Sequence, residues 1–197
     1  MIESLKPLYS AALSPVARIL IKSGIHPNAI TLAGVCISPI AACYAAQGKW
    51  FFAALFIGIG SCMDGLDGLV ARNTGKKSPW GALLDSTADR ITEIAWLSGV
   101  LFFYCNAPGG RLGIFLTFAA MSGALMVSYV RARSEGARIP CASGLLQRPE
   151  RILILMACFL AGSAIMTWGL ALLSVLAYAT VVQRLIVTYK YCKKNPS

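Results

Sequence analysis

Carboxylates gather in one short stretch of an otherwise apolar chain. Five of the eight acidic residues lie between positions 64 and 93. Asp64 and Asp67 are three residues apart, and Asp85 and Asp89 are four apart, so each pair shares one face if its segment is helical. The segment 73–79 between the pairs would bring the two helices together antiparallel. We therefore expect four carboxylates to converge on one small volume.

A purely structural role for such a cluster is unfavourable. An aspartate in mid-membrane costs about 2.5–3.5 kcal/mol, four carboxylates repel one another, and Arg72 and Arg90 could neutralise at most two. Divalent cations remove the repulsion, and oxygen ligands suit Mg²⁺ or Mn²⁺. The single histidine, His26, directly precedes Pro27 and is expected at a helix entrance. The sequence therefore predicts a carboxylate metal site, where Glu93 could support the ligands or pair with Arg90.

Glycines accompany the carboxylates. Gly65 and Gly68 fall inside an expected helix, where each costs roughly 1 kcal/mol relative to alanine, and Gly81 precedes Asp85. They could allow close helix packing, which is common in membranes, or they could clear space for a bulky phosphate or nucleotide. Both roles can hold, and we favour ligand access.

The elements that must position these groups belong to a membrane protein. The chain has 197 residues, 57% apolar and 13% charged, whereas soluble domains carry roughly 25% charge. Apolar segments of bilayer-crossing length recur, which predicts one all-α, polytopic domain over 1–197, with a six-helix bundle over 27–190. The predicted spans are 27–48, 51–72, 80–105, 112–134, 150–167 and 169–190. Segment 1–24 has near-helical apolar spacing interrupted by basic residues, which favours an interfacial amphipathic helix over a secretion signal.

Basic residues predict the orientation. With the amino terminus in the cytoplasm, only Lys49 and Arg111 reach the outer side, an asymmetry typical of the positive-inside rule. We expect a multi-pass protein of the cell membrane with both termini and the active site on the cytoplasmic side. The net charge of +10 then faces anionic headgroups, and no nucleic-acid partner is expected. The seven cysteines have no CxxC spacing and are predicted to be small buried hydrophobes.

Residues 64–89 match the pattern D-x2-D-G-x2-A-R-x8-G-x3-D-x3-D at all eight fixed positions. In this the chain resembles the CDP-alcohol phosphotransferases, whose six-helix topology and amino-terminal helix resemble those expected above. The resemblance implies that two Mg²⁺ or Mn²⁺ ions bind the four aspartates, that Asp89 is the general base, and that the protein forms a homodimer. The residues implied to bind the CDP-lipid are Gly68, Ala71, Arg72, Gly81, Asn28 and Thr31. Asn28 could instead be a helix cap.

A second basic group lies outside this pattern, and guanidinium groups of this kind suit a phosphorylated acceptor. Its members are Arg131, Arg133, Arg138, Arg148, Arg151 and Arg184. These residues could instead anchor the protein on the cytoplasmic side, a role that we favour for Arg133 and Arg138. The candidate acceptor-binding residues are therefore Arg131, Arg148, Arg151 and Arg184. The surrounding stretches resemble bacterial phosphatidylinositol-phosphate synthases, although those often have lysine where this chain has Arg131. That likeness implies that Arg131, Arg151 and Arg184 grip the phosphate of inositol phosphate.

We therefore expect an enzyme that transfers a phosphatidyl group from CDP-diacylglycerol to a phosphorylated alcohol. Inositol phosphate is the first candidate acceptor, and glycerol 3-phosphate, which would make a phosphatidylglycerophosphate synthase, is the alternative. A divalent-cation channel or transporter is a different class that intramembrane carboxylates could also indicate. Its conduction path would need polar groups in both halves of the bilayer, whereas the outer halves here are nearly all apolar.

Overall fold

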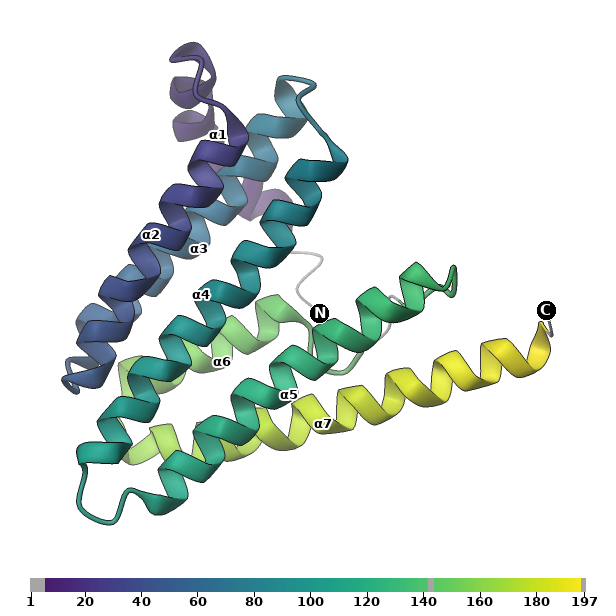
Figure 1. The fold of residues 1–197 in the computed structure, drawn as a ribbon. Coiled ribbons are helices and arrows are strands. Elements are labelled where there is room, and N and C mark those ends of the chain that lie inside the picture. Colours follow the sequence, from purple (N-terminus) through teal and green to yellow (C-terminus); the bar gives the residue numbers. More distant parts are fainter. Residues whose placement is uncertain (1–5, 142–143, 196–197) are drawn as a thin grey trace. The chain divides into compact units, whose positions relative to one another are not determined.

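The computed structural model describes residues 6–141 and 144–195, which form seven helices and no strand (Figure 1). The helices are α1 (Lys6–Lys22), α2 (Pro27–Ala46), α3 (Trp50–Asn73), α4 (Pro79–Asn106), α5 (Arg111–Gly136), α6 (Arg148–Ala161) and α7 (Ser163–Lys194). This confirms the all-α prediction. Four helices, α2, α3, α5 and α7, are long and apolar enough to cross a membrane, which indicates a membrane protein.

The boundary between the last two helices differs from the prediction. A break near residue 168 was expected, but α6 ends at Ala161 and α7 runs without interruption from Ser163 to Lys194. Gly162 separates them with φ 86° and ψ −174°, a conformation that favours glycine. The apolar character continues through this point, so hydropathy placed the break one turn and a half too late.

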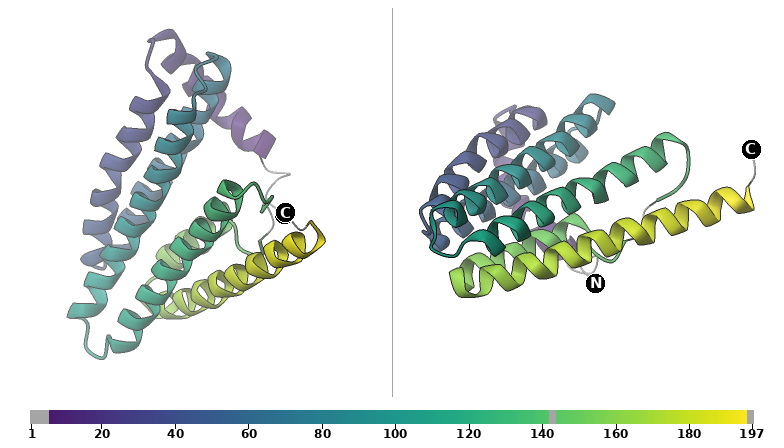
Figure 2. Two further views of the ribbon diagram at one scale, coloured as in Figure 1. Left: turned by 45° about the vertical axis from the view of Figure 1, so that its right-hand side comes forward. Right: turned by 60° about the horizontal axis from the view of Figure 1, so that its bottom comes forward.

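Residues 6–103 form one compact unit. Figures 1 and 2 show α2 and α3 side by side along most of their length. Glycines permit this close packing: a Cβ at Gly34 would lie 3.5 Å from the Cβ of Met63, and a Cβ at Gly99 of α4 would collide with the backbone of Ala42. The antiparallel return from α3 to α4 is made by the short segment 74–78, as the sequence predicted.

The amino-terminal helix packs on α3 within the same unit. Ala17 is buried in a cluster with Leu66 and Val70, and the hydroxyl of Tyr9 donates to the carbonyl of Ser61 at 2.8 Å. On the other side of α1, the side chain of Ile19 is 64% exposed. This helix therefore has an apolar face against α3 and further apolar groups outside it, as an interfacial helix would.

Residues 104–195 form the second compact unit. In it α7 packs along α5 and also contacts α6. The core includes Leu146, Phe159, Met166 and Leu170, each at most 2% exposed.

All seven cysteines are free, and the expectation that they are buried is correct only in part. Cys141 and Cys158 are buried and Cys62 is partly buried. The other four lie on outward helix faces and are exposed: Cys36, Cys43, Cys105 and Cys192.

Candidate active site

Three of the four predicted metal ligands come together. Asp64 of α3 and Asp85 and Asp89 of α4 each offer a carboxylate oxygen, and the three oxygens lie within 4.8 Å of one another. All three side chains are partly buried. Oxygens on opposite sides of a Mg²⁺ ion lie about 4 Å apart, so small side-chain rotations would bring these three onto one cation. The donor set therefore fits a hard divalent ion.

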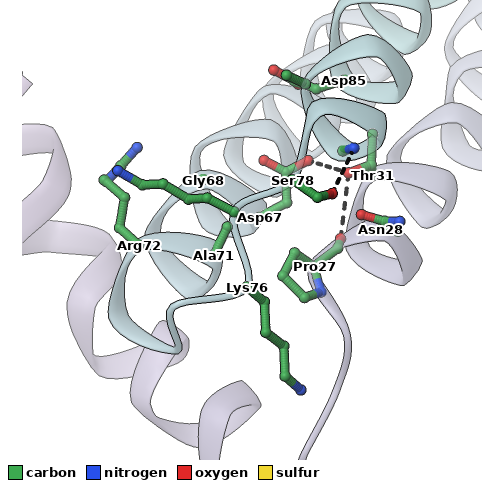
Figure 3. Close-up of a pocket in the computed structure, with 13 residues that line it drawn as sticks. Pro27, Asn28, Thr31, Asp67, Gly68, Ala71, Arg72, Lys76, Ser78 and Asp85 are labelled. Atoms are coloured by element: carbon green, nitrogen blue, oxygen red, sulfur yellow. Dashed lines mark hydrogen bonds between the residues drawn. The ribbon is translucent and has the colours of Figure 1, made fainter.

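Asp67 lies beside this group, close enough to Asp64 and Asp85 for their charges to interact, but is not one of the three. It is only 5% exposed, and its Oδ2 accepts a hydrogen bond from the hydroxyl of Thr31 of α2 at 2.5 Å (Figure 3). Residues three apart on a helix diverge by about 60° around its axis, so Asp67 turns toward α2 while Asp64 turns toward α4. Three of the four expected carboxylates thus lie within reach of one ion, and Asp67 lies near Asp64 and Asp85 and joins Asp85 at a neighbouring cavity.

Arg90 supplies positive charge beside one ligand. Its Nη1 lies 3.7 Å from Oδ2 of Asp89 and also donates to the carbonyl of Ser86. An ion pair of this length is too long for a strong hydrogen bond, so Arg90 moderates the negative charge without covering the carboxylate. Glu93, one turn further along α4, is partly buried.

A cavity of about 290 Å³ opens next to the carboxylates. All six residues predicted to bind the CDP-lipid line it: Asn28, Thr31, Gly68, Ala71, Arg72 and Gly81. They come from the amino-terminal ends of α2 and α4 and the carboxyl-terminal end of α3, and Figure 3 labels five of them, all but Gly81, around one opening. The structure thus gathers residues that are 53 positions apart in the chain.

Two helices begin at this cavity. Nδ1 of His26 accepts the N–H of Asn28 at 3.3 Å, which confirms the helix-entrance role of His26. His26, and not Asn28, is therefore the cap of α2. At the start of α4, Oγ of Ser78 accepts the N–H of Gly81 at 3.0 Å. Amino-terminal helix ends carry partial positive charge, so the cavity suits an anionic group such as a diphosphate.

The glycines beside the aspartates divide between the two roles considered above. A Cβ at Gly65 would lie 2.6 Å from Tyr9 and 2.8 Å from Leu13, so Gly65 serves the packing of α1. Gly68 faces the cavity, and a Cβ there would lie 3.1 Å from Nη1 of Arg72. Gly68 therefore leaves room for the Arg72 side chain and for a ligand.

Five cavity residues were not predicted as site residues: Pro27, Lys76, Lys77, Ser78 and Ala82. For Lys76 and Lys77, the charge pattern of the sequence predicts only a position on the cytoplasmic side. Their place in the chain was a signal that they belong to the site. They lie in the short segment between the two helices that carry the aspartates, and the ends of those helices place this segment at the mouth of the cavity.

The predicted acceptor arginines lie in residues 104–195. Arg151 is 5% exposed and Arg184 is 3% exposed, and Nη1 of Arg184 donates to the carbonyl of Val127 at 2.5 Å. Arg131 is exposed and its Nε contacts Glu135 at 2.8 Å. Both Arg131 and Arg151 lie close enough to Arg184 to repel its charge, and Glu135, the ion-pair partner of Arg131, opposes that repulsion.

Arg148 opens α6 and is partly buried. It lies in the first turn, three residues before Arg151 on the same helix. The predicted fifth span begins at residue 150, two residues after the observed start of α6.

Comparison with known proteins agrees with this geometry. Over 197 residues the chain is 34% identical to the archaetidylinositol phosphate synthase of Methanothermobacter thermautotrophicus, covering 98% of this chain and 96% of that protein. The crystal structure of Mycobacterium tuberculosis phosphatidylinositol phosphate synthase with CDP-DAG bound is similar at TM-score 0.84 and 29% identity, covering 90% of this chain and 93% of that one. The same enzyme in complex with manganese and citrate gives a TM-score of 0.83 at 29% identity, with 90% and 88% covered.

The family match covers most of the chain. Residues 24–188 match the CDP-alcohol phosphatidyltransferase family, and this range contains the whole aspartate pattern and the four arginines. The chain therefore belongs to the CDP-alcohol phosphatidyltransferase family and is a phosphotransferase of that kind.

Proposed function

We propose that this protein transfers the phosphatidyl-type group of a CDP-lipid to inositol phosphate and releases CMP. The observation that carries the proposal is the cavity in which the six expected donor residues adjoin the carboxylates. The acceptor is supported by the buried arginines and by relatives that are named archaetidylinositol and phosphatidylinositol phosphate synthases.

Asp64, Asp67, Asp85 and Asp89 are proposed to hold two divalent cations, Mg²⁺ or Mn²⁺. Bound ions of this kind neutralise charge that develops on a diphosphate and its leaving group. The tight carboxylate trio, with Asp67 near two of its members, supports this assignment, and a related enzyme has been seen with manganese.

The remaining steps use this chain's own residues. Gly68, Ala71, Arg72, Gly81, Asn28 and Thr31 bind the CDP part of the donor. Asp89 accepts the proton of the acceptor hydroxyl, whose oxygen forms a bond to the β-phosphorus. The bond from that phosphorus to the oxygen bridging it to the α-phosphate breaks, and CMP leaves. General-base assistance of this kind contributes about 10²–10⁴-fold to a rate.

The phosphate of the acceptor is assigned to Arg131, Arg148, Arg151 and Arg184. Guanidinium groups bind phosphate through paired hydrogen bonds, and the burial of Arg151 and Arg184 strengthens such contacts. Glycerol 3-phosphate carries the same phosphate and is the second candidate acceptor.

The membrane arrangement is also proposed. Residues 1–197 form one domain in which α1 lies at the interface and α2 to α7 span the cell membrane, with the site and both termini in the cytoplasm. The basic residues near the inner helix ends support it. The protein is proposed to be a homodimer, as the family resemblance implies.

The proposal is tested by a CMP-release assay with purified protein and CDP-diacylglycerol. Inositol phosphate, glycerol 3-phosphate, serine and inositol are compared as acceptors, before and after chelation of divalent ions. We expect the fastest release with inositol phosphate, loss of activity on chelation and recovery with Mn²⁺ or Mg²⁺. Release only with an unphosphorylated acceptor would refute the acceptor assignment. Flux of Mg²⁺ in proteoliposomes without CMP release would favour the transporter alternative.

A further inference from the structure

Two side chains of α7 hold the segment that leads into α6. The N–H of Leu145 donates to Oε1 of Gln183 at 3.0 Å, and the N–H of Leu146 donates to Oγ1 of Thr180 at 3.1 Å. Segment 144–147 is thereby tied to α7 by two hydrogen bonds from its backbone to side chains of that helix. Neither Thr180 nor Gln183 has a role in the chemistry described above.

The bond to Thr180 is buried and has a fixed direction. The Thr180 hydroxyl donates its own proton to the carbonyl of Leu176 at 2.7 Å, so its oxygen acts as an acceptor toward Leu146. Thr180 is 0% exposed and Leu146 is 2% exposed. Water therefore cannot replace the bond, and its loss would leave a buried N–H without an acceptor.

The tied segment lies directly on one of the acceptor arginines. A Cβ at Gly144 would lie 2.9 Å from Cγ2 of Thr180, and 3.2 and 3.3 Å from Nη2 and Nε of Arg184. On another side, Nη1 of this guanidinium donates to the carbonyl of Val127 at 2.5 Å. Arg184 is thus held between α5 and segment 144–147.

The same segment sets the position of a second arginine. Gln147 caps α6 through a reciprocal arrangement with Glu150, in which the Gln147 N–H donates to Oε2 of Glu150 at 2.6 Å. The buried Arg151 follows in the first turn of α6. A shift of the segment would therefore move the start of α6 and Arg151 with it.

We propose that Thr180 and Gln183 are positioning residues for acceptor binding. They fix segment 144–147 so that Arg184 and Arg151 keep the orientation that binds the acceptor phosphate. The inference rests on the proposed function, because it takes these arginines to contact that phosphate. It assigns to Thr180 and Gln183 an effect on the acceptor alone, since the donor cavity is lined by residues 27–85.

The test compares three threonine variants. Thr180→Val removes the acceptor oxygen at constant shape, and Thr180→Ser restores it. Thr117→Val is the matched control, because Thr117 is also 0% exposed and its hydroxyl also donates to the carbonyl four residues earlier, at 2.7 Å. We expect Thr180→Val to raise the KM for inositol phosphate about tenfold. The KM for CDP-lipid and kcat at saturating acceptor should stay near wild type, as should all constants of the Thr180→Ser and Thr117→Val variants.

Two further variants guard against a folding defect in Thr180→Val. Gly144→Ala presses a methyl group toward Arg184 and should give the same acceptor-selective rise. Gln183→Met removes the hydrogen bond to Leu145. Because Gln183 is partly exposed, water can take its place as the acceptor, so the KM for the acceptor should rise less, about threefold. Unchanged acceptor KM in both folded variants, or equal losses for donor and acceptor, would overturn the inference.

The wild-type measurement separates this inference from the proposed function. If the wild type saturates with inositol phosphate and the variants do not change its KM, only the positioning role fails. If the wild type uses glycerol 3-phosphate instead, the proposed acceptor fails, and the same KM comparison with that phosphate decides the positioning role. Activity with unphosphorylated acceptors alone would overturn both.

Discussion

Individual carboxylates in this site have different partners, although the sequence pattern treats them alike. Asp64, Asp85 and Asp89 form a tight group, while Asp67 accepts a hydrogen bond from Thr31. Asp89 also has the guanidinium of Arg90 3.7 Å away. These differences allow the proposed roles of single residues to be separated by conservative substitutions.

Asp89→Asn tests the general base. The amide keeps the shape of the side chain but cannot accept the hydroxyl proton, so we expect turnover to fall by about 10²–10⁴-fold while CDP-lipid binding is largely retained. CMP release and direct binding of the donor provide the two measurements. Ser86→Ala is the control, because the Ser86 hydroxyl donates to the carbonyl of Leu83 within its own helix. Near-normal turnover in Asp89→Asn would show that another group removes the proton.

Thr31→Val tests whether Thr31 orients Asp67. Loss of a hydrogen bond that fixes a metal ligand typically costs 10–100-fold in affinity or activity. We expect the Mn²⁺ concentration for half-maximal activity to rise by about that factor, and Thr31→Ser to restore it. Thr31 also lines the cavity. A raised donor KM at saturating Mn²⁺, with normal Mn²⁺ dependence, would assign Thr31 to the nucleotide instead.

At the scale of helices, two glycines one turn apart on α3 serve different neighbours. Gly65 faces Tyr9 and Leu13 of α1, whereas Gly68 faces the cavity and Arg72. We expect Gly65→Ala to destabilise the protein by about 1–3 kcal/mol through overpacking, seen as a lower Tm. Gly68→Ala should change Tm little, because the end of the flexible Arg72 side chain can move, but should raise the KM for CDP-lipid about tenfold. Equal effects of both variants on Tm would contradict this division.

The sequence predicts the helices themselves well and their ends less well. The starts of α2 to α5 fall within one residue of the predicted spans, because apolar runs there are bounded by prolines, glycines and charges. The start of α7 was misplaced because Gly162 ends α6 through its backbone conformation, which hydropathy does not report. Within the site, spacing alone placed Asp67 with the other three aspartates. Its bond to Thr31 depends on the packing of α2 against α3, which periodicity does not define.

For the molecule as a whole, the surface chemistry fits a bilayer. Large apolar side chains are exposed on helices of both compact units, among them Phe102, Phe115, Trp168 and Val175, at 63% or more. Soluble monomers rarely expose apolar patches of great extent. Such side chains are stable where lipid replaces water, and the basic residues then decide which way the helices run.

The proposed orientation can be tested with the chain's own cysteines. Cys105 in the last turn of α4 and Cys192 near the end of α7 are both exposed, so proteins that retain only one of them can be labelled with a membrane-impermeant maleimide in intact spheroplasts. Six spans with a cytoplasmic amino terminus place Cys105 outside and Cys192 inside. We expect Cys105 to react at once and Cys192 only after permeabilisation.

The physical reason is the charge next to each cysteine. Lys190, Lys193 and Lys194 surround Cys192, whereas Arg111 alone lies near Cys105, and the cytoplasmic side retains the more basic segment. Retention of CMP release by both single-cysteine proteins provides the control for folding. Labelling of Cys192 from outside would invert the topology. It would also place the aspartates at the outer surface. Four proposed spans, α4 to α7, separate the end of α3 from the end of α7, so these two ends lie on the same side of the membrane, whereas the end of α4 lies on the opposite side.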